Sequence, residues 1–498
     1  MGEAGDEEHD GVVGRVARWF DARLGLSYEF LRPTPQYAIN PFYWLGALAV
    51  VAFVIQAVSG MLMMLYYVPD PSQAYQSTQF IFQNVSYGTF LETVHLYTAY
   101  AMILLVFMHM MRGYFVSVHK KPRELMWVTG MLMGFVTLGL GFTGYLLPWT
   151  VVSKSATDVG AGMISALPQP LSNFLSFLVV GAGGDAAELL RFFDLHVIVL
   201  PAILLVLLVV KMYMLEAHGI SEPVTGHAGS EEGGKLIPIF PNVTFYLAEL
   251  AALFGAAMML FSVLFPLVLQ PGYTATAASH YTSQQPDWYF LWIYQLLKIS
   301  AFENAGLPVA LTFVTLIFVL LFLLPFLDRG KARRINQRPF YVTLGLVLVA
   351  EIVALTIWGY LTPGEVIPDE QAALVLGGTA LAVVVISLLS YRLVLGRLVG
   401  RMSTVSPQRS VIGSSGIWTA AAFSFLLGLG ALAMGSAVNS LTGLVSTGGT
   451  LGSWAYLAGV SGILAAAMVA TMYLLYRVDL GTGAVRRRIR AFEVGWRD

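Results

Sequence analysis

The chain has 498 residues, of which 57% are apolar and only 11% are charged, and its mean hydropathy is +0.71. This composition is typical of an integral membrane protein. The formal net charge of −1 gives no indication of a nucleic-acid partner. The chain has no cysteine, which excludes disulfides, covalently attached c-type haem and thiolate-bound iron–sulfur clusters or zinc within it. Any cofactor must therefore be held by His, Lys, Met or carboxylate side chains.

Ten transmembrane helices are predicted from runs of about twenty apolar residues, so the predicted fold is an all-α, polytopic helix bundle. Before them, residues 11–31 have the pattern of an amphipathic helix that lies on the membrane surface. Basic residues gather in the loops after the second, sixth, eighth and tenth predicted spans. By the positive-inside rule, both termini are expected in the cytoplasm. The predicted spans lie near 42–67, 91–115, 125–147, 190–216, 244–269, 306–327, 340–361, 371–396, 414–436 and 453–476.

The second predicted span carries two histidines, His95 and His109, fourteen residues apart. In an α-helix this separation returns to within about 40° of the same face and rises about 21 Å. A buried histidine inside a membrane is costly unless it has a partner. The pair is compatible with two stacked haems across the bilayer, and equally with two unrelated polar residues near the helix ends.

Glycines in the neighbouring spans repeat this spacing. Gly46 and Gly60 lie fourteen residues apart in the first span, and Gly130 and Gly144 do so in the third. Glycine lets a bulky group approach the helix backbone closely. Packing of small residues between helices is the alternative explanation, but the three matching intervals favour a haem at each of two levels.

The fourth predicted span supplies a candidate second axial ligand at each level. His196 lies near its outer end, and Lys211 follows fifteen residues later. The bilayer interior disfavours an ammonium group, and a neutral lysine amine can coordinate iron. The alternative is a lysine that extends to the inner membrane surface. Register favours ligation, because the next histidine, His218, lies seven residues beyond Lys211 and about 10 Å farther along the helix.

Composition divides the chain into five parts. A polar, Gly- and Pro-rich linker follows the fourth span. The last three predicted spans are rich in Ala, Gly, Leu and Val and are interpreted as packing or partner-docking helices. The predicted parts are an N-terminal tail and surface helix (1–31), a four-helix dihaem bundle (32–217), a cytoplasmic linker (218–243), a second membrane region (244–362), and three additional helices with a basic cytoplasmic tail (363–498).

Several motifs, in this order, resemble cytochrome b of the cytochrome bc and b6f quinol-oxidising complexes. They are NPFYWLG at 40–46, the His95/His109 helix, KKPRELMWVTG at 120–130, GFTGYLLPW at 141–149, RFFDLH at 191–196, HGISEP at 218–223 and PDWYFLWIYQLLK at 286–298. The resemblance covers about residues 12–362. It implies a fused cytochrome b6 and subunit IV with extra C-terminal helices, and an eight-helix family fold. It also implies two non-covalent b-type haems in the first four helices.

The resemblance assigns the ligands of each haem. His95 and His196 would ligate the outer haem iron, and His109 and Lys211 the inner one. The family has histidine where this chain has Lys211, which makes this residue the largest departure from the family pattern. Arg112 matches an arginine that pairs with a propionate of the inner haem.

The motif PDWY at 286–289 matches the outer quinol site of the family, which usually has Glu at the position of Asp287. Quinol oxidation releases two protons, and a carboxylate beside the ring can accept one of them. Tyr289 belongs to the same motif, and the resemblance places Tyr145 on the opposite wall. The Asp form resembles that of menaquinol users and favours menaquinone. Candidate polar groups for the inner quinone site are Glu216, His218 and Glu249.

Two further departures lie near the outer site. Glu92 stands where the family has an arginine that faces the outer-haem propionates, and Arg191 or Lys298 could take over that charge. Lys154 and Asp158 stand where the family helix is more apolar.

The resemblance implies the core subunit of a quinol:electron-acceptor oxidoreductase in a prokaryotic inner membrane, coupled to proton translocation. Its expected partners are membrane quinol, a Rieske-type iron–sulfur protein and a c-type cytochrome or other acceptor, within a homodimeric complex. The alternatives are a dihaem membrane anchor of another quinone-linked dehydrogenase or reductase, a transporter with incidental histidines, and a degenerate cytochrome b that acts as a scaffold.

Overall fold

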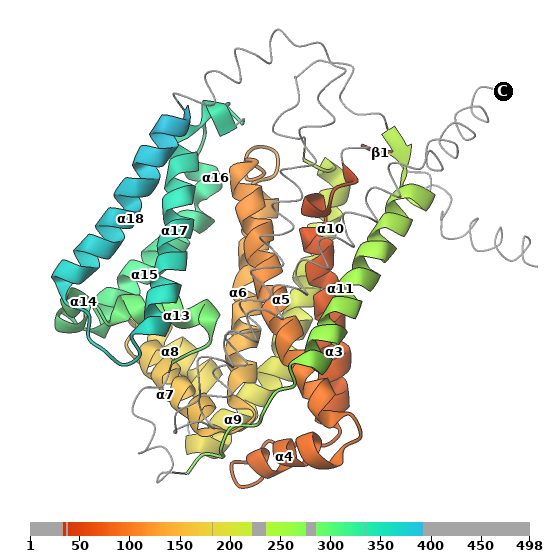
Figure 1. Ribbon diagram of the computed structural model, residues 1–498, viewed down its shortest axis with the longest axis vertical. Helices are drawn as coiled ribbons and strands as arrows, with labels where there is room; N and C mark the ends of the chain where they lie inside the picture. The colour runs from red at the N-terminus through yellow and green to blue at the C-terminus, as the bar shows by residue number, and fades with distance from the viewer. Residues whose placement is uncertain are drawn as a thin grey trace, which may run out of the picture.

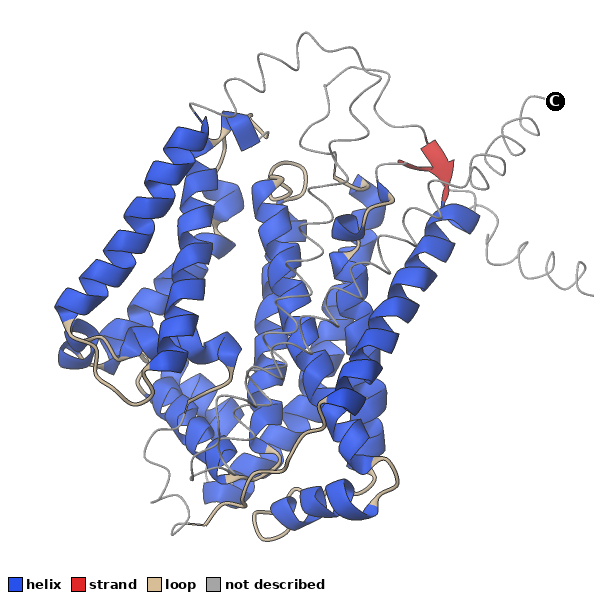
Figure 2. Ribbon diagram, viewed as in Figure 1, coloured by secondary structure: helices blue, strands red, loops and turns tan. Residues whose placement is uncertain are grey.

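The computed structural model describes residues 33–35, 38–181, 183–221, 236–274, 285–333 and 335–391. This part of the chain is a bundle of helices, which confirms the predicted fold class (Figures 1 and 2). Beside the bundle, β1 (Pro33–Pro35) pairs antiparallel with β2 (Leu236–Pro238). The predicted surface helix at 11–31 and the predicted spans at 414–436 and 453–476 lie outside the described residues.

Seven of the described helices are long and apolar enough to cross a membrane, and each overlaps a predicted span. The chain is therefore a multipass membrane protein. The seven helices are α3 (Leu45–Met64), α5 (Gly88–Phe115), α6 (Glu124–Leu146), the continuous helix Gly184–His218, α11 (Thr244–Leu264), α17 (Pro339–Leu361) and α18 (Asp369–Leu389).

The predicted span at 306–327 forms a shorter apolar helix, α15 (Leu307–Phe322), followed by α16 (Leu324–Leu327). Pro325 lies in the first turn of α16, where it has no N–H to donate to the preceding turn. The remaining helices are α4 (Ala74–Asn84), α7 (Val151–Ser165), α8 (Leu171–Leu175), α13 (Trp288–Leu297) and α14 (Ser300–Ala305).

The helices enclose two apolar cores. The larger core lies among α3, α5, α6 and α11, where the small side chains of Ala52 and Ala101 are fully buried and let α3 and α5 pack closely. The second core joins α13 to α15, α17 and α18 through Trp292, Val314 and Leu355. In Figure 1 the helices of the second core lie on one side of α6, and α3, α5 and α11 lie on the other.

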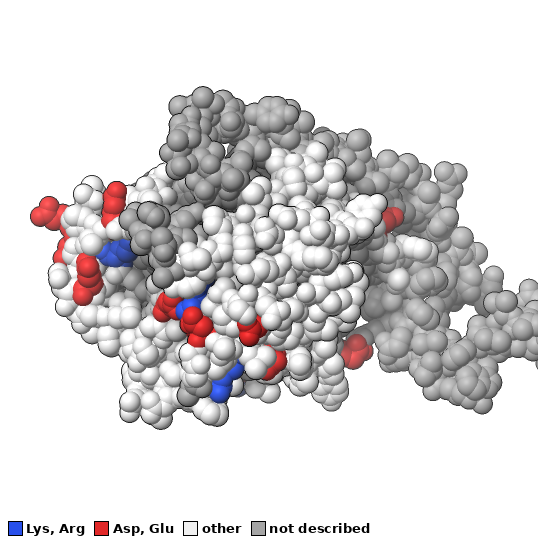
Figure 3. All heavy atoms as spheres, turned by 90° about the horizontal axis from the view of Figure 1, so that it is seen from below, with Lys and Arg blue, Asp and Glu red and all other residues white. Residues whose placement is uncertain are grey.

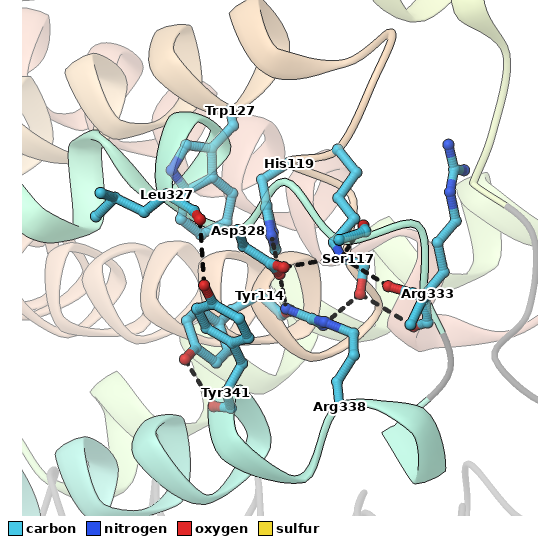
Figure 4. A network of polar contacts seen from close by, with 12 residues as sticks. Tyr114, Ser117, His119, Trp127, Leu327, Asp328, Arg333, Arg338 and Tyr341 are labelled. Atoms are coloured by element: carbon cyan, nitrogen blue, oxygen red, sulfur yellow. Dashed lines mark hydrogen bonds and ion pairs between the residues drawn. The ribbon is translucent and has the colours of Figure 1, made fainter.

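A buried set of polar side chains joins the loop after α5 to the segment between α16 and α17 (Figure 4). We call Ser117, His119, Lys120, Asp328 and Arg338 the polar clasp, and each of them is at most 7% exposed. The Asp328 carboxylate accepts hydrogen bonds from His119 Nε2 at 3.0 Å and from the Arg338 guanidinium, and Lys120 Nζ lies 2.9 Å from its other oxygen. Arg338 also donates to Ser117. The polar clasp thereby fixes the second core against the α5–α6 pair.

The charges within the polar clasp compensate one another. Burial by itself raises the pKa of Asp328, but hydrogen bonds from Lys120 and His119 and the charge of Arg338 outweigh it and hold this pKa below its ordinary value. Burial lowers the pKa of His119 to about 4, so its imidazole is neutral at pH 7. The Asp328 anion therefore faces two cations and one neutral hydrogen-bond donor.

We expect Asp328→Asn to destabilise the fold by about 3–5 kcal/mol, because Lys120 and Arg338 would stay buried without their anion. The folded-state pKa of Asp328 is lowered, so its contribution is present above the ordinary pKa and lost as pH falls through the folded-state value. Thermal unfolding of the solubilised protein, followed by circular dichroism at several pH values, measures this loss. Glu370→Gln, an exposed carboxylate in the first turn of α18, is the matched control. Equal melting temperatures for Asp328→Asn and the control would contradict the expectation.

Candidate functional site

The two histidines of α5 each face a glycine of α3. A Cβ atom placed on Gly60 would lie 3.3 Å from Cε1 of His95, and one placed on Gly46 would lie 3.1 Å from Cε1 of His109. Because contacts this short are tighter than ordinary van der Waals packing, a larger residue would displace the imidazole. The glycines of α3 therefore leave room for an imidazole at two levels of the bundle.

The third and fourth spans repeat this arrangement. A Cβ atom on Gly144 would lie 2.9 Å from Nδ1 of His196, and one on Gly130 would lie 2.7 Å from Nζ of Lys211. Each of the four glycines singled out by spacing thus faces one of the four candidate ligands. His95 and His196 lie at one level, which we call the outer level after the predicted orientation. His109 and Lys211 lie at the other, which we call the inner level.

The helix that carries His196 and Lys211 is not a regular α-helix throughout. It consists of α9 (Gly184–Asp194), the π-helical turn Leu195–Val199 and α10 (Leu200–His218). A π-turn accommodates one extra residue. The fifteen residues from His196 to Lys211 therefore cover the same rotation as the fourteen residues between the histidines of α5. Pro201, the second residue of α10, has no N–H to donate to the preceding turn. Its position favours the π-helical turn.

At the outer level the two imidazoles face each other. The ring centroids of His95 and His196 are 6.1 Å apart, with an interplanar angle of 68°. Ser59 donates to the carbonyl of Ile55 and can accept from Nδ1 of His95, 2.9 Å away. Nδ1 of His196 lies 3.0 Å from the carbonyl oxygen of Leu140. With both Nδ1 atoms held in this way, each Nε2 would be the atom available to ligate a metal.

At the inner level an imidazole faces an amine. Nδ1 of His109 is buried without a hydrogen-bond partner in the described part of the chain. His109 and Lys211 lie within electrostatic range of each other. The Lys211 amine forms no hydrogen bond or ion pair with the described residues. A buried imidazole nitrogen without a hydrogen-bond partner and an amine 2.7 Å from the Cβ position of Gly130 fit a haem held by one histidine and one lysine.

Arg112 lies three residues beyond His109, in the last turn of α5. Its guanidinium carbon is 4.0 Å from the centre of the Tyr43 ring, and its Nη2 donates to Ser221 Oγ at 3.4 Å. The residue therefore sits at the inner end of the bundle, on the same helix as the inner-level histidine. A cation in this place can neutralise a haem carboxylate.

Asp287 lies directly before α13 and is held by tyrosines from two helices. Tyr100 of α5 donates to Oδ1 of Asp287 at 2.8 Å, and Tyr289 donates to Oδ2 at 3.4 Å. Tyr145 of α6 interacts electrostatically with the same carboxylate. Burial raises the pKa of Asp287 to about 6, against the effect of the two hydrogen bonds. A carboxylate with this pKa is suited to accept a proton near neutral pH.

Sequence reasoning missed Tyr100. It lies five residues after His95, inside an apolar span and only 5% exposed. A buried phenol in a membrane helix requires a hydrogen-bond partner, and this requirement was the available signal. The identity of the partner could not be inferred, because Asp287 is 187 residues farther along the chain.

The departures near the outer site have structural partners. Lys154 of α7 is 4% exposed and forms ion pairs with Asp158, with Asp185 at 3.3 Å and with Glu188 at 3.5 Å. Burial by itself lowers the pKa of Lys154, but the acidic groups outweigh it and raise this pKa above its ordinary value. The cluster therefore ties α7 to α9. Acidic side chains with few basic ones mark this face in the described part of the molecule (Figure 3).

The remaining charged side chains predicted near the outer level make contacts of their own. Arg191 donates to the carbonyl of Phe177 and lies over its ring, and Lys298 donates to the carbonyl of Thr362. Glu92 lies near the outer end of α5, within electrostatic range of Tyr67.

The three candidates for the inner quinone site are all exposed. Glu216 and His218 lie in the last turn of α10, and Glu249 lies in the second turn of α11. The backbone carbonyl of His218 accepts a hydrogen bond from Arg123 at 2.9 Å.

Two family models match the chain. The model described as cytochrome b/b6/petB matches residues 32–219, and the model described as cytochrome b(C-terminal)/b6/petD matches residues 275–376. The first match covers all four candidate ligands, and the second covers Asp287. The second match also continues into α18, beyond the predicted boundary at residue 362.

Known relatives give the same family. Cytochrome b of Sulfolobus acidocaldarius is 32% identical over 395 residues, which cover 74% of this chain and 69% of the relative. A cytochrome bc complex cytochrome b subunit of Chlorobaculum thiosulfatiphilum is 32% identical over 361 residues, covering 70% and 81%. Cytochrome b6 of Heliobacterium modesticaldum is 41% identical over 193 residues, covering 39% and 90%.

A solved structure has the same fold. A hyperthermophilic respiratory complex III chain superposes with a TM-score of 0.60 at 24% identity, covering 76% of this chain and 95% of that one. The fold defines a multipass helical membrane protein. The chain belongs to the cytochrome b family, and it joins in one polypeptide the regions matched by the b6-type and C-terminal models.

Proposed function

We propose that this chain is the cytochrome b subunit of a quinol-oxidising bc-type complex. The observation that carries the proposal is the hydrogen bond from Tyr100 to Asp287. It attaches the candidate proton acceptor to α5, the helix that also presents His95 and His109. A proton-accepting site and two haem levels are thereby built on one rigid element.

Four residues would hold two b-type haems. His95 and His196 would hold the outer haem, and His109 and Lys211 would hold the inner one. The haems, when bound, would carry one electron across the membrane over about 21 Å of helix. The four facing glycines leave space for them, and Arg112 lies where it can neutralise an inner-haem carboxylate.

The outer site would oxidise quinol. Loss of two electrons from a quinol releases two protons, and the Asp287 carboxylate would accept one of them. Tyr289 and Tyr145 would orient the ring beside it. One electron would leave to an external acceptor and the other would cross to the inner side. Two such oxidations would supply the two electrons that reduce one quinone to quinol there, with uptake of two protons. The Asp form of the motif resembles that of menaquinol users, which supports menaquinol as the substrate.

The external acceptor would be a Rieske-type iron–sulfur protein that passes electrons to a c-type cytochrome or a similar carrier. The absence of cysteine supports this, because the chain cannot ligate an iron–sulfur cluster itself through thiolates. We place the complex as a homodimer in a prokaryotic cytoplasmic membrane, with both termini inside. Glu216, His218 and Glu249 are the candidate groups for the inner quinone site.

The test is a reduced-minus-oxidised absorbance spectrum and redox titration of the purified complex, together with quinol-dependent reduction of a one-electron acceptor. We expect two b-haem components per chain and turnover in the presence of the Rieske partner. Absence of b-haem absorbance would refute the proposal. Two haems without a co-purifying iron–sulfur protein would favour a dihaem membrane anchor instead.

A further inference from the structure

Tyr100 connects the two halves of the outer site. Its ring is 5% exposed and packs against Trp288 and Tyr289, with ring centroids 6.4 and 6.3 Å away. Its hydroxyl donates to Asp287 Oδ1 at 2.8 Å. Along α5 it lies about 7.5 Å from His95. A single side chain thus reaches from the haem-ligand helix to the residue that precedes α13.

This contact is the shorter of the two hydrogen bonds on Asp287. The bond from Tyr289 is 3.4 Å long and comes from the same short segment as Asp287 itself. Among the described residues, the groups that interact with the carboxylate are three phenols, Tyr100 from α5, Tyr289 from α13 and Tyr145 from α6. No cation pairs with this carboxylate among the described residues. Its charged form therefore depends on phenol hydrogen bonds, and chiefly on Tyr100.

We propose that Tyr100 is a positioning residue that aims the Asp287 carboxylate at the outer quinol site and keeps it ionised, ready to accept a proton. The inference rests on the proposed role of Asp287 in quinol oxidation. An aspartate is one methylene shorter than a glutamate and has less reach. A phenol supplied from α5 fixes this short carboxylate against a helix that is distant from α13 in the sequence.

The direction of the effect follows from the charge of the accepting group. A hydrogen bond to a carboxylate favours its ionised form, and removal of the bond raises the pKa. Burial already raises the pKa of Asp287 to about 6. Loss of the Tyr100 hydroxyl raises it further, so a larger fraction of Asp287 is protonated at a given pH and cannot accept a proton from quinol.

The test compares Tyr100→Phe with Tyr97→Phe in the intact complex. Tyr97 lies one turn earlier on α5, is 4% exposed, and donates to the carbonyl of Phe265 at 2.8 Å instead of to Asp287. The first readout is the pH profile of quinol oxidation. The second is the infrared band of the protonated carboxyl group, titrated with pH and assigned by its loss in Asp287→Asn. Unchanged b-haem absorbance in both variants reports an intact fold.

We expect Tyr100→Phe to shift the acidic limb of the profile and the infrared titration upward by about 0.5–1 pH unit. The rate on the acidic limb then falls about three- to tenfold, and the rate at higher pH changes little. Tyr97→Phe should leave both midpoints in place. A shifted infrared titration supports the inference even where Asp287→Asn retains turnover, a result that would refute the proposed role of Asp287 alone. An unshifted infrared titration, or an equal loss of rate at every pH, would overturn the inference.

Discussion

Lys211→Ala is expected to remove the low-spin signal of the inner haem while leaving that of the outer haem unchanged. The amine of Lys211 lies 2.7 Å from the Cβ position of Gly130, in the place that Gly144 gives to His196 at the outer level. Alanine offers no donor atom, so the inner iron would keep only His109 as a protein ligand. We expect the inner component of the redox titration to shift strongly or to disappear. Complete loss of the inner haem would leave one b haem per chain.

The experiment has an internal control at the other level. His196→Ala should remove the outer component and spare the inner one, so the two variants should give complementary spectra. Lys211→His offers a conservative replacement, and we expect it to restore a low-spin haem with bis-histidine features in electron paramagnetic resonance. Two unchanged bis-histidine signals in Lys211→Ala would show that Lys211 is not a ligand.

Asp287→Asn is expected to lower quinol oxidation by about 10²- to 10⁴-fold while both haems remain bound. The amide has nearly the shape of the carboxylate but cannot accept the proton released by quinol. In the unchanged protein, burial raises the pKa of Asp287 to about 6. Because the ionised form is the base, the wild-type rate should rise with pH through about 6, and Asp287→Asn should lose this dependence.

Two further variants define the cause of the loss. Glu303→Gln alters an exposed carboxylate on α14, the next helix after α13, and should leave turnover unchanged. Asp287→Glu restores a carboxylate at the same position and should recover most of the activity. Stopped-flow reduction of the b haems by quinol measures the step directly. Undiminished haem reduction in Asp287→Asn would show that the carboxylate is not the proton acceptor.

Long apolar runs made the membrane architecture predictable. Each of the seven long helices overlaps a predicted span, because about twenty apolar residues in a bilayer must form a helix. The predicted span at 306–327 breaks near its end at Pro325, where a backbone donor is missing. The sequence shows this proline, but the mean hydropathy of the 306–327 window does not respond to a single residue.

Spacing along one helix was informative about the candidate site, whereas contacts between distant segments were not. Gly46, Gly60, Gly130 and Gly144 were singled out by a shared interval, and the structure places each beside a candidate ligand. Tyr100 and Asp287 could not be paired from the sequence, since their contact depends on how α13 packs against α5. The partners Asp185 and Glu188 of Lys154 were likewise hidden, because they belong to another helix.

The π-helical turn Leu195–Val199 makes the two ligand-bearing helices respond differently to a change in length. Removing one residue between His196 and Lys211 could be absorbed by converting the π-turn to regular α-helix, with the angle between the two ligands preserved. The same deletion between His95 and His109 finds no such turn within α5 and would rotate one histidine by about 100° away from its partner. The helix Gly184–His218 would therefore tolerate a single-residue deletion between its two candidate ligands, whereas α5 would not.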